Sequence, residues 1–158
     1  MKLIERNFEN PDVHKLLIKH FIELKSVSPD GSAHVLDITG LKNPTIKFWS
    51  VWNNNELIGC GALKFLNKEH GEFKSIRVND NYRKKGYGIR IINYLILESK
   101  KLNIKKISLE TGAGEYFLPA RKLFDKCGFK PCSPFAYYKE DINSCYLSML
   151  ISNYSSFY

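Results

Sequence analysis

The chain has 158 residues, of which 44% are hydrophobic and 25% charged, and its formal net charge is +8. This length suits a single domain, and the composition excludes a disordered chain. No apolar run reaches the roughly 20 residues of a membrane span, and the charged first residues exclude a signal-peptide core. We therefore expect a protein of the cytoplasm with no membrane partner.

The four cysteines are scattered, with no C-x-x-C pair and no spacing typical of a zinc site. A reducing compartment and burial as small hydrophobic side chains fit this scatter better than disulfides do. We expect free thiols and no metal site; the residues concerned are Cys60, Cys127, Cys132 and Cys145.

The first part of the chain predicts a strand, a helix and a hairpin. Residues 2–6 read as a strand, and Asn10 and Pro11 supply the N-cap and first position of a helix that runs to about residue 25. Turn residues in 26–44 predict a loop with one short helix. The β-branched and aromatic residues of 45–52 predict a strand, which pairs with residues 56–66 across a turn of three asparagines.

The rest of the chain predicts three more strands and two helices. A strand over 71–79 is followed by a helix over 86–101, a strand over 105–110, a helix over 119–127 and a strand over 144–151. The element order β-α-β-β-β-α-β-α-β predicts a mixed α/β architecture. In the 71–79 strand, alternation places Phe73, Ser75 and Arg77 on one face and Glu72, Lys74, Ile76 and Val78 on the other.

Positive charge is concentrated just after that strand. Residues 71–90 contain a strand, a turn and a helix start, and five basic residues fall within 77–90: Arg77, Arg83, Lys84, Lys85 and Arg90. The first amides of a helix lack internal partners, and the helix dipole adds to their attraction for anions. Because Gly86 and Gly88 lack a Cβ atom, a phosphate could approach their backbone closely. The segment therefore predicts a pyrophosphate site.

Two common nucleotide motifs do not match this segment. No G-x-x-x-x-G-K-[ST] loop is present, and the fingerprint G-x-G-x-x-G fails because Ile91 stands where its third glycine belongs. The pattern that remains is R-x-x-G-x-G at Arg83, Gly86 and Gly88. It resembles the pyrophosphate loop, [QR]-x-x-G-x-[GA], of the GNAT superfamily of acyl-CoA N-acyltransferases. The segment Ala120–Phe129 is similar to that family's A-x-x-L-[YF]-x-x-x-G-F element.

The resemblance implies one GNAT-like domain over residues 1–158, an α/β (α+β) fold with a mostly antiparallel central sheet of about six to seven strands flanked by helices. It also implies acetyl-CoA as cofactor and transfer of its acetyl group to a primary amine of a small molecule or protein. In such a fold the third strand and the loop hold the cofactor. The implied residues are Ile76, Arg77, Val78, Arg83, Lys84, Lys85, Gly86, Tyr87, Gly88 and Ile89.

The amine must lose a proton before it can attack. An amine with a pKa of ~10.4 is only about one-thousandth neutral near pH 7.4, so a general base could contribute roughly 10²–10⁴-fold. Glu72 occupies a strand position where several family members carry such a base. A surface Glu72 paired with Lys74 is the alternative interpretation, and Glu110 is the second candidate for the base.

Two positions depart from the family pattern. Phe124 stands where many members have a tyrosine that protonates the departing thiolate, and Phe117 stands where an asparagine is common. The proton could then come from Tyr116, Cys127 or water, or the thiolate could leave unassisted.

Alternative functions and the acceptor stay open. The clusters 83–90 and 100–106 would also suit a non-catalytic nucleic-acid-binding module, and the two phenylalanines would suit an acyl-CoA sensor. The 26–44 loop with His34, the two tryptophans and the aromatic run 135–138 could shape the acceptor site. The tail 154–158 could pack against a second subunit in a homodimer.

Overall fold

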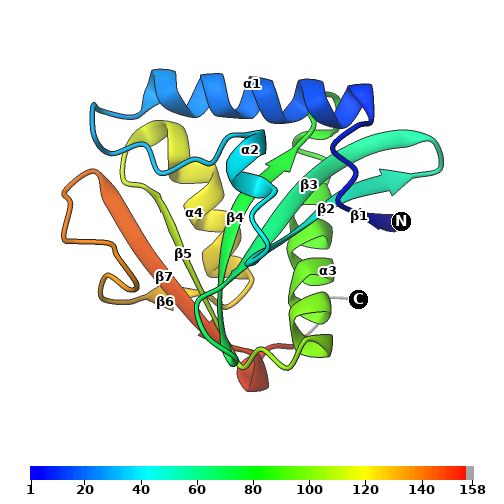
Figure 1. The fold of residues 1–158 in the computed structure, drawn as a ribbon. Coiled ribbons are helices and arrows are strands. Elements are labelled where there is room, and N and C mark those ends of the chain that lie inside the picture. Colours follow the sequence, from blue (N-terminus) through cyan, green and yellow to red (C-terminus); the bar gives the residue numbers. More distant parts are fainter. Residues whose placement is uncertain (156–158) are drawn as a thin grey trace.

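The computed structural model describes residues 1–155, which form a single mixed α/β domain around a seven-stranded sheet (Figure 1). The strand order is β1-β2-β3-β4-β5-β7-β6, and only the β4–β5 pair is parallel. The strands are β1 (Lys2–Glu5), β2 (Ile46–Asn53), β3 (Glu56–Phe65), β4 (His70–Val78), β5 (Lys106–Gly112), β6 (Lys130–Pro131) and β7 (Ser144–Leu150). The α-helices are α1 (Pro11–Val27), α2 (Ile38–Leu41), α3 (Tyr87–Lys101) and α4 (Leu118–Lys126).

The predicted elements are confirmed, with small shifts at their ends. The Asn10 side chain caps α1 by accepting from the amides of Asp12 and Val13, as its sequence position indicated. Three short 3₁₀ segments, Asp80–Tyr82, Glu115–Phe117 and Ile151–Asn153, complete the described chain. Strand β6 was not predicted, because two residues are too few to show any periodicity. No helix within residues 1–155 is long and apolar enough to cross a membrane.

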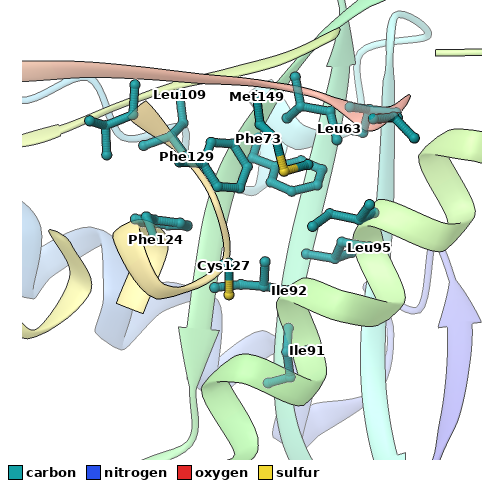
Figure 2. Packing of buried hydrophobic residues seen from close by; sticks show 14 of the residues in the cluster. Leu63, Phe73, Ile91, Ile92, Leu95, Leu109, Phe124, Cys127, Phe129 and Met149 are labelled. Atoms are coloured by element: carbon teal, nitrogen blue, oxygen red, sulfur yellow. The ribbon is translucent and has the colours of Figure 1, made fainter. Parts of the chain in front are cut away.

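Two hydrophobic clusters cover the two faces of the sheet. On one face Ile92 and Leu95 of α3 and Phe124 of α4 pack against Leu63 and Phe73 of the sheet (Figure 2). On the other face the helices α1 and α2 pack against β2 and β3; the buried residues are Val13, Leu16 and Leu17 of α1, Leu41 of α2, Phe48 of β2 and Ala62 of β3. The sheet is therefore a central layer between α1–α2 and α3–α4.

A β-bulge interrupts the alternation of β4. Cys60 of β3 pairs with Arg77 and Ala62 pairs with Lys74, so a single β3 residue lies opposite both Ser75 and Ile76. Ser75 has a positive φ of 54°. A bulge adds one residue to a strand, which moves the side chains beyond it to the opposite face.

Because of the bulge, the side chains of β4 are divided between its two faces differently from the prediction. Arg77 pairs with Glu23 of α1, whereas Ile76 and Val78 pack against the cluster beneath α3. Glu72 and Arg77 thus share the α1 face, and Ile76 and Val78 lie on the α3 face. The predicted grouping was wrong because it assumed a strict period of two along the whole strand.

Strands β4 and β5 separate just beyond Glu72. Their register pairs His70 with Lys106, Gly71 with Ile107 and Glu72 with Ser108, and no later pair joins the two strands within the described chain. Figure 1 shows them close together at the lower edge of the sheet and apart where they approach α1. The later part of β4 therefore has an edge outside the ladder with β5.

Candidate functional site

The loop between β4 and α3 has the backbone of an anion site. Lys84 and Gly86 both have positive φ, 60° and 83°. Gly86 is the N-cap of α3 and, within residues 1–155, no side chain caps this helix start. The first amides of α3 are therefore available to a ligand, and the helix dipole favours a negative one. A Cβ on Gly86 would meet nothing within 4 Å, so this glycine serves the left-handed backbone conformation.

Gly88 has a different role from the one expected. A Cβ atom at this position would lie 2.7 Å from Cδ2 of Leu123, on α4. The missing side chain therefore allows α3 to approach α4 closely. The expectation that it makes room for a phosphate is corrected, because its Cβ direction faces the neighbouring helix.

Several side chains of the loop remain available to an anion. Lys84 and Lys85 are exposed and form no ion pair with any residue in 1–155. The Arg83 Nε atom lies 3.1 Å from Asp80 Oδ1, which leaves the rest of its exposed guanidinium accessible. The Tyr87 ring packs edge-on against Tyr82 at a centroid distance of 5.5 Å. Ile89 is partly buried against the α3 core and can offer only its main chain.

The Arg77 side chain is committed to the protein itself. It is 5% exposed, and its Nη2 atom lies 2.6 Å from Glu23 Oε2 and 3.2 Å from Asp80 Oδ1. The hydrogen bond from Arg77 holds the pKa of the Glu23 carboxyl below its usual range. Glu23 also accepts a 2.8 Å hydrogen bond from the Tyr116 hydroxyl. Arg77 therefore ties β4 to α1, and only its main chain is left for a ligand along the strand edge.

Glu72 is a buried carboxylate with two partners. Its side chain is 2% exposed, and Glu72 is the last residue of β4 that pairs with β5. Its Oε2 atom accepts a hydrogen bond of 2.5 Å from the Tyr138 hydroxyl and lies 3.3 Å from the Lys74 ammonium. Lys74 in turn donates to the Tyr138 oxygen at 3.1 Å. The alternative interpretation of a Glu72–Lys74 pair is confirmed as a contact, but in a buried place and with a third member.

Tyr138 is held as a hydrogen-bond donor. Burial and the negative charge of Glu72 both raise the pKa of its phenol. Nothing in the spacing of the two residues indicated this contact, since they lie 66 positions apart. The aromatic run around Tyr138 was the only sequence signal.

Glu110 lies near the end of β5, across the separation from β4. Its Oε2 atom accepts a hydrogen bond of 2.7 Å from the Ser144 hydroxyl. Burial, with a smaller contribution from the charge of Glu72, raises the pKa of the Glu110 carboxyl. A carboxyl with a raised pKa is a stronger base once ionised. The two candidate bases thus occupy neighbouring strands but different environments.

A cavity of about 760 Å³ adjoins Glu72. Its floor is formed by β3 and β4, and its walls by residues 31–36 before α2 and residues 136–142 before β7. The Ser32 hydroxyl donates to Asp141 Oδ2 at 2.8 Å, which joins the two walls. His34 packs edge-on against Tyr138 at 5.0 Å. The 26–44 loop and the aromatic run therefore meet at this cavity, as expected, whereas both tryptophans lie in the core.

The departures from the family pattern lie away from the cavity. Phe124 is 7% exposed and packs against Phe129, so it only fills the core (Figure 2). Burial raises the pKa of the Cys127 thiol to about 11. The four cysteines are free thiols.

Comparison with known proteins identifies the family. The model of the Acetyltransferase (GNAT) family matches residues 10–129. This chain belongs to the GNAT acetyltransferases. It is 42% identical over 136 residues to the uncharacterized N-acetyltransferase YsnE of Bacillus subtilis, covering 86% of this chain and 90% of that protein.

Solved structures share the fold of this GNAT protein. An acyl-CoA N-acyltransferase from Klebsiella pneumoniae has a TM-score of 0.78 and 18% identity, over 95% of this chain and 97% of that one. A Bacillus subtilis acetyltransferase in complex with CoA has a TM-score of 0.70 and 19% identity, over 94% of this chain and 97% of that one. The implied fold and the enzyme class, an acyl-CoA-dependent acetyltransferase, are confirmed.

Proposed function

We propose that this GNAT protein transfers an acetyl group from acetyl-CoA to a primary amine of a small molecule or protein. The observation that carries the proposal is the separation of β4 and β5 just beyond Glu72. It leaves a free strand edge between the uncapped start of α3 and the cavity beside Glu72. A long cofactor with an anionic middle and a reactive end fits that sequence of features.

The residues of the loop and strand fit such a cofactor. The amides from Lys84 to Ile89 would hold the pyrophosphate, with support from Arg83 and Lys85. The main chain of Ile76, Arg77 and Val78 would bind the pantetheine arm as a neighbouring strand would. Acetyl-CoA supplies, when bound, a thioester carbonyl carbon that an amine can attack.

Glu72 is proposed as the general base. Its Oε2 atom accepts both hydrogen bonds, and Oε1 has no hydrogen-bond partner within residues 1–155. Oε1 can therefore take the amine proton, directly or through water, while Lys74 stabilises the ionised carboxylate. In the overall transfer an amide N–C bond forms and the thioester C–S bond breaks. The amine proton goes to the base and the sulfur leaves as a thiolate.

Protonation of the thiolate does not depend on Phe124. A thiol with a pKa near 8.5 leaves readily, and water in the separation can protonate it. Tyr116, which the sequence offered as a proton donor, is exposed and its hydroxyl donates to Glu23.

An amine panel with detection of free thiol tests the proposal. We expect thiol release that depends on both acetyl-CoA and an amine, and a thermal melt stabilised by about 2.7 kcal/mol at roughly 100 Kd of acetyl-CoA. Gly86→Val should abolish the shift in the melt, because a β-branched residue cannot adopt φ of 83° at the loop. Absence of both thiol release and the shift would refute the proposal.

A non-catalytic acyl-CoA sensor, in contrast, would show the melt shift without thiol release for any amine. The free cysteines are consistent with a reducing compartment such as the cytoplasm.

A further inference from the structure

We infer that the acceptor amine carries an acidic group, a carboxylate or a phosphate, and that Lys64 binds this group in the cavity beside Glu72. This inference rests on the proposed function, since it names the class of acceptor. It also favours a small molecule over a protein amine.

Lys64 is an uncompensated cation on the floor of the cavity. It lies directly opposite Glu72 in the β3–β4 register, lines the cavity and is partly buried. Its ammonium forms no hydrogen bond or ion pair with any residue in 1–155. The neighbouring Lys74, by contrast, is paired with Glu72. Burial of a charge is costly unless it is paired, so an anionic group of a ligand is favoured at Lys64.

The carboxylates around the cavity already have hydrogen-bond donors or lie exposed at its rim. Asp141 accepts from Ser32 Oγ and from the Asn143 amide, both at 2.8 Å. Lys139 and Glu140 are adjacent exposed residues of opposite charge at the rim. Glu72 has its two partners on β4 and in the 136–142 wall. Of the two lysines on the floor of the cavity, Lys64 and Lys74, only Lys74 has an anionic partner within residues 1–155.

The geometry limits the size of the acceptor. Residues directly opposite in an antiparallel pair have Cβ atoms ~5 Å apart. An amine beside Glu72 and an acidic group at Lys64 therefore belong to one molecule, with only a few bonds between the two groups. The remaining wall includes Val35, Leu36 and Ile142, which suits an apolar substituent. An amino acid with an apolar side chain has this arrangement.

The experiment compares matched amines by acetyl-CoA-dependent thiol release. Phenylalanine is set against phenylalaninamide and phenethylamine, and O-phosphoethanolamine against ethanolamine, so that carboxylate and phosphate are distinguished. We expect kcat/KM to be at least about tenfold higher for an acid-bearing amine than for its neutral counterpart, as for a hydrogen bond to a charged group. We expect Lys64→Met to remove that difference through KM and Lys64→Arg to retain it.

Lys68→Met is the matched control, because Lys68 is an exposed lysine in the turn between β3 and β4. Melting curves of each variant exclude loss of the fold. Equal turnover of acidic and neutral amines, or an equal loss for all amines in Lys64→Met, would overturn the inference and leave the proposed function intact. No thiol release with any amine would count against the proposed function itself, and with it against this inference.

Discussion

The Tyr138 hydroxyl lies 2.5 Å from Glu72 Oε2, so the segment between β6 and β7 donates a hydrogen bond to a carboxylate buried in β4. Lys74 contacts both residues, at 3.3 Å and 3.1 Å. The cavity wall and the proposed base are therefore parts of one polar cluster. Loss of one member destabilises the others, because each supplies a hydrogen bond to a polar group with little access to water.

Loss of the Tyr138 hydroxyl should destabilise the protein. We expect Tyr138→Phe to lower the free energy of unfolding by about 1.5–3 kcal/mol, the usual contribution of a hydrogen bond to a charged group. Urea unfolding measures the change. Tyr137→Phe is the control, since Tyr137 is 93% exposed. Equal stability of the two variants would show that the Tyr138–Glu72 hydrogen bond makes no net contribution to the free energy of unfolding.

Removal of the Lys74 charge should be more harmful. Lys74→Met leaves the Glu72 carboxylate buried beside a single hydrogen-bond donor, and breaking a buried pair in this way costs about 3–5 kcal/mol. The double variant Glu72→Gln with Lys74→Met removes both charges and should recover much of the loss. The measurement is again urea unfolding. A double variant no more stable than Lys74→Met alone would contradict the pairing.

Glu72 and Glu110 can be separated by their effects on turnover. If Glu72 is the base, Glu72→Gln should lower kcat by roughly 10²-fold or more and leave acetyl-CoA binding unchanged. Glu110→Gln should then have a small effect. Steady-state kinetics between about pH 6 and 9 and calorimetric binding measure both quantities. Normal turnover of Glu72→Gln, with a loss in Glu110→Gln, would transfer the role to Glu110, whose pKa is raised by burial.

The contact between α3 and α4 predicts that a second substitution, at Leu123, restores a Gly88 variant. Gly88→Ala places a methyl group 2.7 Å from Leu123 Cδ2, which should destabilise the fold and displace the start of α3. Overpacking of this kind costs about 1–3 kcal/mol. Adding Leu123→Ala makes room for the methyl group and should restore acetyl-CoA affinity. Failure of the second change to restore any affinity would return Gly88 to a direct role in binding.

His20 makes stability depend on pH. Burial and the neighbouring Arg77 charge lower its pKa to about 4, against ~6.5 in an unfolded chain. Between these values the unfolded state binds more protons, so stability is complete above about pH 6.5 and falls as the pH approaches 4, by up to about 3 kcal/mol.

Unfolding midpoints across this range test the effect. His20→Gln should show a shallower loss of stability on acidification than the unaltered protein. His14→Gln, at an exposed position of the same helix, should show the original slope. Identical slopes in all three proteins would mean that His20 is protonated without penalty in the native state.

The sequence predicted the fold well where local patterns were strong. Asn10 and Pro11 marked the start of α1, β-branched and aromatic residues marked β2 with β3 as its hairpin partner, and alternation marked β4. The glycines and cations before α3 located the loop that the structure leaves uncapped. Each of these signals lies within a few residues of the feature that it predicts, and local preferences are enough to produce it.

The features that the sequence did not predict depend on contacts between distant segments of the chain. The bulge at Ser75 has no composition signal, since neither glycine nor proline marks it. The direction of the absent Cβ at Gly88 depends on where Leu123 lies after the chain has folded. Arg77 resembled a phosphate ligand in the sequence, but a glutamate 54 positions earlier binds it.

The additional residue at Ser75 makes β4 intolerant of changes in length. Deletion of one residue there would restore strict alternation and rotate one half of the strand by half a turn. If the first half of the strand rotates, the Glu72 carboxylate enters the hydrophobic core beneath α3. If the second half rotates, the aliphatic side chains of Ile76 and Val78 replace Arg77 against α1. A surface turn absorbs such a deletion locally, whereas here the deletion decides whether the Glu72 carboxylate lies beside Lys74 and Tyr138 or among apolar side chains.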